Sequence, residues 1–350
     1  MGASGRLLVA ADSRAEDIEK EIDQEIEELP SHKATTFCEV KLWNIIREEA
    51  MEGVAQEPLL AGFLHSTLLS HGNLYDALCF RLANKLASPT LLPTQLQTII
   101  GDVFLCDKYV RRAIIMDLLA VKERDPACRG YSTPILYFKG FQAIQSYRVA
   151  HSLWNQDRKA LALALQSLIS DVFHVDIHPG ARIGMGLLMD HAIGVVIGET
   201  AVIGDDCSIL HNVTLGGNGK STGDRHPKVG DGVLLGAHVT ILGNIRIGNY
   251  AKIGAGSVVL TDIPPHSTAV GVPARVVGKT DACPSLSMNH KIQKCPVLSA
   301  FSSSSLSSYS TSGSNSRTPS PKDNNSEQGP WDSYMALQPN ENIFIHDFQI

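Results

Sequence analysis

Two histidines, His191 and His226, stand in segments whose residue types could carry proton-transfer chemistry. An imidazole titrates near neutral pH, so it can serve as the base that an alcohol, a weak nucleophile, needs in order to react. Such a base needs a carboxylate to hold its tautomer. Asp176, fifteen residues before His191, is one candidate; adjacent Asp190 is the other, although neighbours on a strand point to opposite faces. These residues indicate base-assisted transfer to a hydroxyl group.

The elements that must position these residues show a repeat of six. After Val175 glycine becomes frequent, and an aliphatic residue recurs at every sixth position. Fixed short periods are typical of solenoids. One inward aliphatic per six residues predicts a left-handed parallel β-helix, in which glycine permits tight turns. The residues that follow the period are Ile177, Ile183, Met189, Ile197, Ile203, Ile209, Leu215, Val229, Leu235, Ile241, Ile247, Ile253 and Val259.

The period is interrupted at two places, and each interruption contains one of the two histidines. Met189 and Ile197 are eight residues apart instead of six, and Leu215 and Val229 are fourteen apart, where we expect twelve. The second interval includes a polar loop, residues 216–227. Solenoids accept insertions chiefly as loops on a binding face. We therefore expect a functional site here; the alternative is that each histidine only caps a turn.

The rest of the chain divides by composition, and the fold class that we predict is α + β-solenoid. Residues 1–36 form an acidic segment with a short helix, and residues 37–174 have the apolar periodicity of an all-helical domain. Residues 175–280 form the β-helix. Residues 281–340 are a Ser-rich linker too polar to bury a core, so we expect disorder. Residues 341–350 regain apolar side chains and indicate a partner-binding peptide.

Composition excludes several classes of protein. The net charge of −6 and a pI of about 6.1 disfavour a nucleic-acid partner. No apolar run approaches the roughly 18 residues that span a bilayer, so we expect no membrane association. The seven cysteines include no Cys-x-x-Cys pair, which disfavours a disulfide framework or a zinc knuckle. The acidic N-terminal segment disfavours a transit peptide, so we predict a cytoplasmic protein.

Specific motifs in residues 37–279 resemble the serine acetyltransferase family. The resemblance implies transfer of acetyl from acetyl-CoA to the hydroxyl of L-serine, which gives O-acetyl-L-serine and CoA in the first step of cysteine biosynthesis. It implies acetyl-CoA as co-substrate and no metal. The motifs are Asp125-Pro126, Tyr131-Ser132-Thr133-Pro134, Lys139-Gly140-Phe141, Asp176-Ile177-His178-Pro179, Asp190-His191-Ala192, Gly198-Glu199-Thr200, Val213-Thr214-Leu215-Gly216-Gly217, Asp224-Arg225-His226-Pro227-Lys228 and Gly271-Val272-Pro273-Ala274-Arg275.

The resemblance also implies roles for individual residues. His191 becomes the general base and Asp176 its orienting partner. Asp125 and Asp190 would bind the ammonium group of serine, and Arg225 would bind its carboxylate, which suits the fork of a guanidinium. Opposite charges then face each other at both ends of the substrate.

The remaining implied contacts concern the transition state and the acetyl donor. His226 would lie over the substrate as a binding or oxyanion-stabilising group. The pantetheine of CoA would run near Gly216, Ala237, Lys252 and Ala255. Members of the family form a homotrimer or a dimer of trimers with the pocket between subunits, so the loop with His226 would serve a neighbour's base.

The resemblance implies one protein partner, and two other functions stay open. The C-terminal Ile350 would bind O-acetylserine sulfhydrylase, unless the tail is simply frayed. A metal-dependent hydratase on the same fold would need three convergent histidines, and the spacing of His191, His211 and His226 offers no such set. The chain could also be a weakly active subunit that chiefly regulates the sulfhydrylase.

Overall fold

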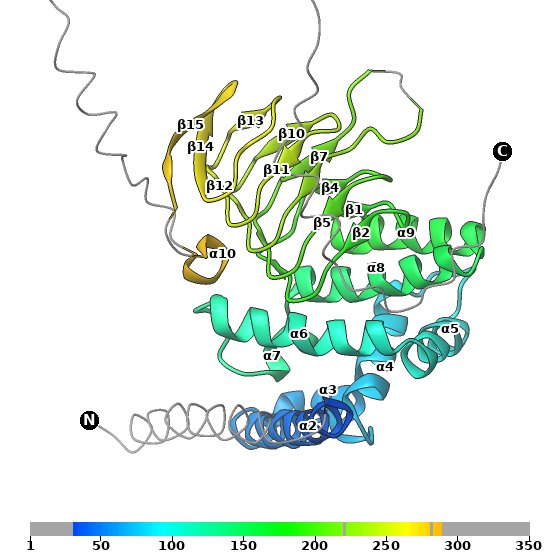
Figure 1. Cartoon of the computed structure of the whole chain (residues 1–350). Helices are drawn as coiled ribbons and strands as arrows, with labels where there is room; N and C mark the ends of the chain where they lie inside the picture. The colour runs from blue at the N-terminus through cyan, green and yellow to red at the C-terminus, as the bar shows by residue number, and fades with distance from the viewer. Residues whose placement is uncertain (1–30, 220–221, 281–282, 289–350) are drawn as a thin grey trace, which may run out of the picture. The chain divides into compact units, whose positions relative to one another are not determined.

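The structure is a computed structural model that describes residues 31–219, 222–280 and 283–288, with side chains from Glu39 onward. The acidic segment before residue 31, the Ser-rich linker beyond residue 288 and the peptide that ends in Ile350 lie outside the described residues. Figure 1 shows the described part as a group of helices followed by a coil of short strands. The predicted α + β-solenoid is therefore confirmed for these residues.

The helices come first in the chain, and polar caps define several of their ends. The Asn73 side chain accepts a hydrogen bond from the Asp76 amide at 3.0 Å, and the Asp107 carboxylate accepts from two amides of the next turn. His174, in the left-handed conformation, ends the last helix before the strands. The helices are α2 Ser31–Gln56, η1 Pro58–Leu60, α3 Ala61–Leu64, η2 His65–Leu69, α4 Leu74–Leu86, α5 Pro93–Cys106, α6 Lys108–Arg124, α7 Ser132–Leu136, α8 Lys139–Asn155 and α9 Lys159–Phe173.

The strands form a parallel solenoid of three sheets, and only β15 runs antiparallel to its neighbour. Sheet A contains β1 Val175–Ile177, β4 Val195–Ile197, β7 Thr214–Gly216, β10 Thr240–Leu242 and β13 Val258–Val259. Sheet B contains β2 Arg182–Ile183, β5 Val202–Ile203, β8 Lys228–Val229 and β11 Arg246–Ile247. Sheet C contains β3 Leu188–Met189, β6 Ser208–Ile209, β9 Leu234–Leu235, β12 Lys252–Ile253, β14 Ser267–Gly271 and β15 Ala274–Lys279. A short helix, α10 Pro284–Ser287, follows.

The sheet register confirms that the aliphatic period builds the core. Ile177 pairs with Ile197, which pairs with Leu215, and the series continues along sheet A. Equivalent stacks run through sheets B and C, and every member of the period is buried. Each turn therefore contributes three inward aliphatics, one per sheet, and the stacked side chains exclude water from the interior of the coil.

One expectation about the period was wrong. Leu215 and Val229 lie on the consecutive strands β7 and β8, because Val229 pairs with Ile203 in sheet B. The fourteen-residue interval therefore replaces the six residues of a single corner, not twelve. The polar loop is accordingly a longer insertion than we expected, and its described residues, 216–219 and 222–227, run from the end of β7 of sheet A to β8 of sheet B (Figure 1).

Buried charged side chains join the helices to the solenoid. Arg148 on α8 and Asp117 on α6 form an ion pair of 2.8 Å in which both side chains are buried. The pair also binds the solenoid, since Arg148 donates to the Gly184 carbonyl and Asp117 accepts from the Leu187 amide. The helices thus fix the first turn of the coil.

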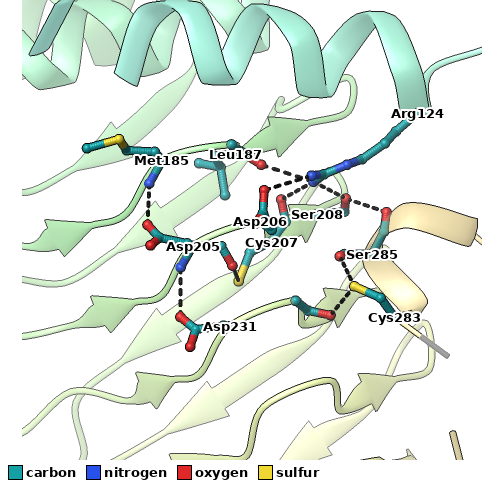
Figure 2. A network of polar contacts seen from close by, with 12 residues as sticks. Arg124, Met185, Leu187, Asp205, Asp206, Cys207, Ser208, Asp231, Cys283 and Ser285 are labelled. Atoms are coloured by element: carbon teal, nitrogen blue, oxygen red, sulfur yellow. Dashed lines mark hydrogen bonds and ion pairs between the residues drawn. The ribbon is translucent and has the colours of Figure 1, made fainter. Parts of the chain in front are cut away.

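A second network ties the end of α6 to sheet C and to α10. Figure 2 shows the guanidinium of Arg124 reaching toward Asp206 and Ser208, and it also donates to two backbone carbonyls. Ser208 in turn donates to the carbonyl of Ser285 at 3.0 Å. The residue after Arg124 is the predicted substrate ligand Asp125, so this network fixes the backbone at that position.

Candidate active site

The first interruption forms a corner between sheets C and A, which we call the His191 corner, residues 190–194. His191 and Ala192 both adopt the left-handed conformation, with φ of 55° and 61°. This bend leaves 74% of the His191 side chain exposed. The Asp190 carboxylate lies 3.8 Å from Nε2 of His191, which is longer than a hydrogen bond. An accessible imidazole next to a carboxylate is the arrangement that a general base requires.

Asp176, the other candidate partner, lies beside this corner. The Gly194 amide donates to the His174 carbonyl at 2.8 Å, which places the corner next to the start of β1. The Asp176 carboxylate accepts a 2.7 Å hydrogen bond from Gln166 on α9. No hydrogen bond joins Asp176 to His191 among the described residues, so the orienting role stays a prediction.

The second interruption forms the corner between sheets A and B, which we call the Arg225 corner, residues 198–201 and 222–227. Arg225 forms an ion pair of 2.9 Å with Glu199. The backbone amides of Arg225 and His226 both donate to the Thr200 hydroxyl, at 3.1 and 3.2 Å. Thr200 therefore anchors the end of the polar loop to the coil and holds the guanidinium at the surface.

His226 is enclosed by this corner. Its side chain packs against Gly198, where an added Cβ would collide with the ring, and only 7% of the residue is exposed. Its Nδ1 lies 2.9 Å from the Thr200 hydroxyl. Burial lowers the pKa of His226, and the positive charges of Arg225 and Lys228 lower it further. The ring is therefore held neutral, with Nδ1 occupied by Thr200 and Nε2 left for another group.

The carboxylates of the Arg225 corner are held in their charged form. The hydrogen bond from Arg225 lowers the pKa of Glu199, and the hydrogen bond from Lys228 lowers the pKa of Asp224. An open cavity of about 340 Å³ adjoins these groups, lined by Trp154, Gly180, Arg182, Glu199, Thr200 and Asp224. Mixed charges around an open cavity suit a small zwitterionic ligand better than an apolar one.

Within one protomer the two corners lie at opposite ends of the strands of sheet A. Strand β4 separates them, and its three residues span about 10 Å at ~3.3 Å per residue. No hydrogen bond or ring contact links His191 with His226 in the part of the chain that the structure describes. Each corner therefore presents half of the predicted site.

The other predicted ligands fall in different places. Ala237 and Ala255 lie on successive turns above the His191 corner, where the Gly256 amide donates to the Ala237 carbonyl at 2.8 Å. Lys252 is buried on sheet C, and burial lowers the pKa of its ammonium. Gly216 is the last residue of β7, at the end of the strand that leads to the Arg225 corner. Within one protomer, two of the four predicted CoA contacts, Ala237 and Ala255, therefore lie near the predicted general base, His191.

Asp125 caps the end of α6 and accepts a 2.8 Å hydrogen bond from the Ala127 amide. Among the described residues, no hydrogen bond or ion pair joins it to either corner of the same protomer. No three His, Cys, Asp or Glu side chains in the described ranges are grouped so as to hold a metal ion. No helix of the described part is long and apolar enough to cross a membrane.

Sequence reasoning missed four residues that contact the predicted site. Glu199 and Thr200 occur in a quoted motif, but nothing in the motif showed that they hold Arg225 and His226. Gln166 lies on a helix and reaches Asp176 across the junction with the coil. His211 contacts the His191 ring from the next turn. Only the solenoid register, which brings residues about 20 positions apart together, could have indicated the last contact.

This fold and site define a class: a hexapeptide-repeat transferase with an exposed histidine at an interrupted corner. Residues 226–261 match the family model described as bacterial transferase hexapeptide (six repeats), and residues 42–146 match serine acetyltransferase, N-terminal. The chain belongs to the serine acetyltransferase family, and it is an acyltransferase.

The membership rests on extensive similarity. Serine acetyltransferase 4 of Arabidopsis thaliana is 58% identical over 250 residues, which cover 71% of this chain and 70% of that protein. Serine acetyltransferase of Escherichia coli K12 is 54% identical over 249 residues, covering 71% and 91%. The solved structure of soybean serine acetyltransferase complexed with serine superposes with a TM-score of 0.67 at 59% identity, covering 68% of this chain and 98% of that one.

Proposed function

We propose that His191 of one protomer and Arg225 and His226 of a neighbouring protomer form one active site that acetylates L-serine from acetyl-CoA. The observation that carries this proposal is the position of the two corners at opposite ends of the strands of sheet A. Neither corner alone offers both a base and a carboxylate receptor. In a cyclic homotrimer each contact is heterologous, so one protomer's His191 corner meets the next protomer's Arg225 corner. Three equivalent sites result.

In this site the chain's own groups bind both ends of serine. Arg225, already oriented by Glu199, receives the carboxylate as a planar fork. Asp190, beside the base, and Asp125 receive the ammonium. The serine hydroxyl is thereby held near Nε2 of His191. Such positioning converts a bimolecular encounter into an oriented one, which is a large part of the rate gain in group transfer.

The reaction then proceeds by proton transfer and attack. His191 takes the proton from the serine Oγ as the oxygen forms a bond to the thioester carbonyl carbon. The Nε2–H of His226 donates to the oxygen on which negative charge develops. When the intermediate collapses, the C–S bond breaks and the His191 imidazolium returns the proton to the CoA sulfur. The products are O-acetyl-L-serine and CoA, and every proton is accounted for.

The proposal also includes the acetyl donor and a protein partner. The pantetheine runs along the turns above the His191 corner, beside Ala237 and Ala255, whose side chains are small. The peptide 341–350, which ends in Ile350, binds O-acetylserine sulfhydrylase; its deletion should abolish the complex and leave kcat unchanged. The acidic N-terminal segment favours a cytoplasmic location, which a fluorescent fusion would test.

Co-expression of two inactive variants tests the shared site. His191→Ala and Arg225→Ala each disable a different corner, so mixed trimers should regain about a quarter of wild-type sites for random 1:1 assembly. A matched pair, His191→Ala with His226→Ala, should recover to a similar extent. Mixed trimers with no activity, when each variant is folded and trimeric, would show that the whole site lies within one protomer.

A further inference from the structure

Three histidine rings lie in a row along the corner that carries the predicted base. The rings of His191 and His211 lie edge to face, with centroids 5.9 Å apart at 79°. The rings of His211 and His238 repeat this contact at 5.2 Å and 83°. Each ring comes from a different turn of the solenoid: His191 and His211 are the second residues after β3 and β6, and His238 is the third residue after β9. A ladder of imidazoles therefore begins at the base and continues away from it.

The solenoid register produces this ladder. Strands β3, β6 and β9 are adjacent and in parallel register, with Met189 beside Ile209 and Ile209 beside Leu235. His191 and His211 occupy equivalent positions on neighbouring turns, and neighbouring strands lie about 4.8 Å apart, so these two side chains meet at ring-contact distance. His238 lies one position further along the next corner. The His238 amide also donates to the His211 carbonyl at 3.0 Å, which fixes the middle position.

The middle ring differs from the base in its surroundings. His191 is largely exposed, whereas Nδ1 of His211 is enclosed and has no hydrogen-bond partner among the described residues. Ring contacts with His191 and His238 therefore hold His211 in the described part of the chain. Its ring is the aromatic contact of His191 in the described part of the chain, and the Asp190 carboxylate is too distant for a hydrogen bond.

We propose that His211 is a positioning residue for His191, and that its ring fixes the orientation of the base imidazole before substrate binds. The inference rests on the proposed function, which makes His191 the base. Edge-to-face contacts favour one ring orientation by about two- to tenfold. Because His191 otherwise faces solvent, this contact selects the orientation in which Nε2 points toward the serine site.

Replacement of the ring provides the test. His211→Ala should lower kcat by about two- to tenfold and leave the KM for serine and for acetyl-CoA nearly unchanged. His211→Phe keeps the ring and removes the enclosed Nδ1, so it should restore most of kcat. His266→Ala is the matched control, because His266 also makes a ring contact on the coil, with Tyr250, away from both corners. It should leave kcat unchanged.

A second readout separates this proposal from the proposed function. In protein labelled at histidine, the ring protons of His191 should shift in His211→Ala without substrate, and His211→Phe should keep a ring-current shift. His211→Ala added to His191→Ala should cause no further loss of activity. Full activity in His191→Ala would overturn the proposed function. An inactive His191→Ala together with wild-type kcat in His211→Ala, or equal loss in His211→Ala and His211→Phe, would overturn the positioning role.

Discussion

Gln166 Nε2 donates a 2.7 Å hydrogen bond to the Asp176 carboxylate, across the junction between the last helix and the first strand. The contact holds one carboxylate oxygen and leaves the other for a neighbouring group. Asp176 lies beside the His191 corner, so the helical region sets the rotamer of the carboxylate that is expected to orient the base.

Loss of this hydrogen bond should therefore impair catalysis. Gln166→Ala should lower kcat about tenfold, in line with the effect of other supporting hydrogen bonds. Gln166→Glu should be worse, because two carboxylates would face each other. Steady-state kinetics check this, with Gln97→Ala as control, because Gln97 on α5 is half-buried like Gln166 and lies away from both corners. Wild-type kcat in Gln166→Glu would contradict the assigned role of Asp176.

The contact between Gly198 and His226 predicts a second effect. An added Cβ at Gly198 would collide with the His226 ring, while Gly62 has open space around it. Gly198→Ala should displace the ring and lower kcat/KM by about 100-fold, the range seen when an oxyanion donor is lost. Gly62→Ala, in helix α3, should leave kinetics unchanged. A crystal structure of Gly198→Ala with His226 in place would refute this explanation.

The lowered pKa of His226 makes stability depend on pH. The unfolded chain binds a proton at this residue as the pH falls below the usual value of 6.5, whereas the folded chain resists it. Wild type should therefore lose stability relative to His226→Gln as the pH falls from about 7 to about 5. Urea unfolding at both pH values measures the difference, with His266→Gln as control. A difference that is constant with pH would contradict the prediction.

The buried ion pair between Asp117 and Arg148 predicts a large effect on stability. Arg148→Met leaves the Asp117 carboxylate buried without its partner and should cost about 3–5 kcal/mol. Lys159→Ala breaks an exposed pair with Asp157 and should cost less than about 1 kcal/mol. Denaturant unfolding compares them. Equal costs would show that the pair does not join α6 and α8 to the coil as described.

The core of the solenoid could be predicted from the sequence, and much of the site could not. The aliphatic period predicts the stack from Ile177 to Val259, because a single inward side chain per strand leaves few alternatives. The period does not show how many corners an insertion spans. The interval before Val229 spans a single corner, which only the pairing of Val229 with Ile203 shows.

Contacts between distant segments were the part that composition and spacing could not supply. Arg225 and Glu199 are 26 residues apart, and the geometry of the polar loop brings them together. Gln166 reaches Asp176 because α9 ends directly before β1. These contacts depend on three-dimensional placement of polar side chains, for which no short sequence pattern exists.

Release of free thiol from acetyl-CoA tests the central claim most directly. The purified full chain is mixed with acetyl-CoA and L-serine, and His191→Ala is compared with His266→Ala. If His191 takes the serine proton, wild type and His266→Ala should release thiol in a serine-dependent reaction. The rate should fall by at least about 100-fold in His191→Ala. Thiol release at the wild-type rate in folded His191→Ala would contradict the account.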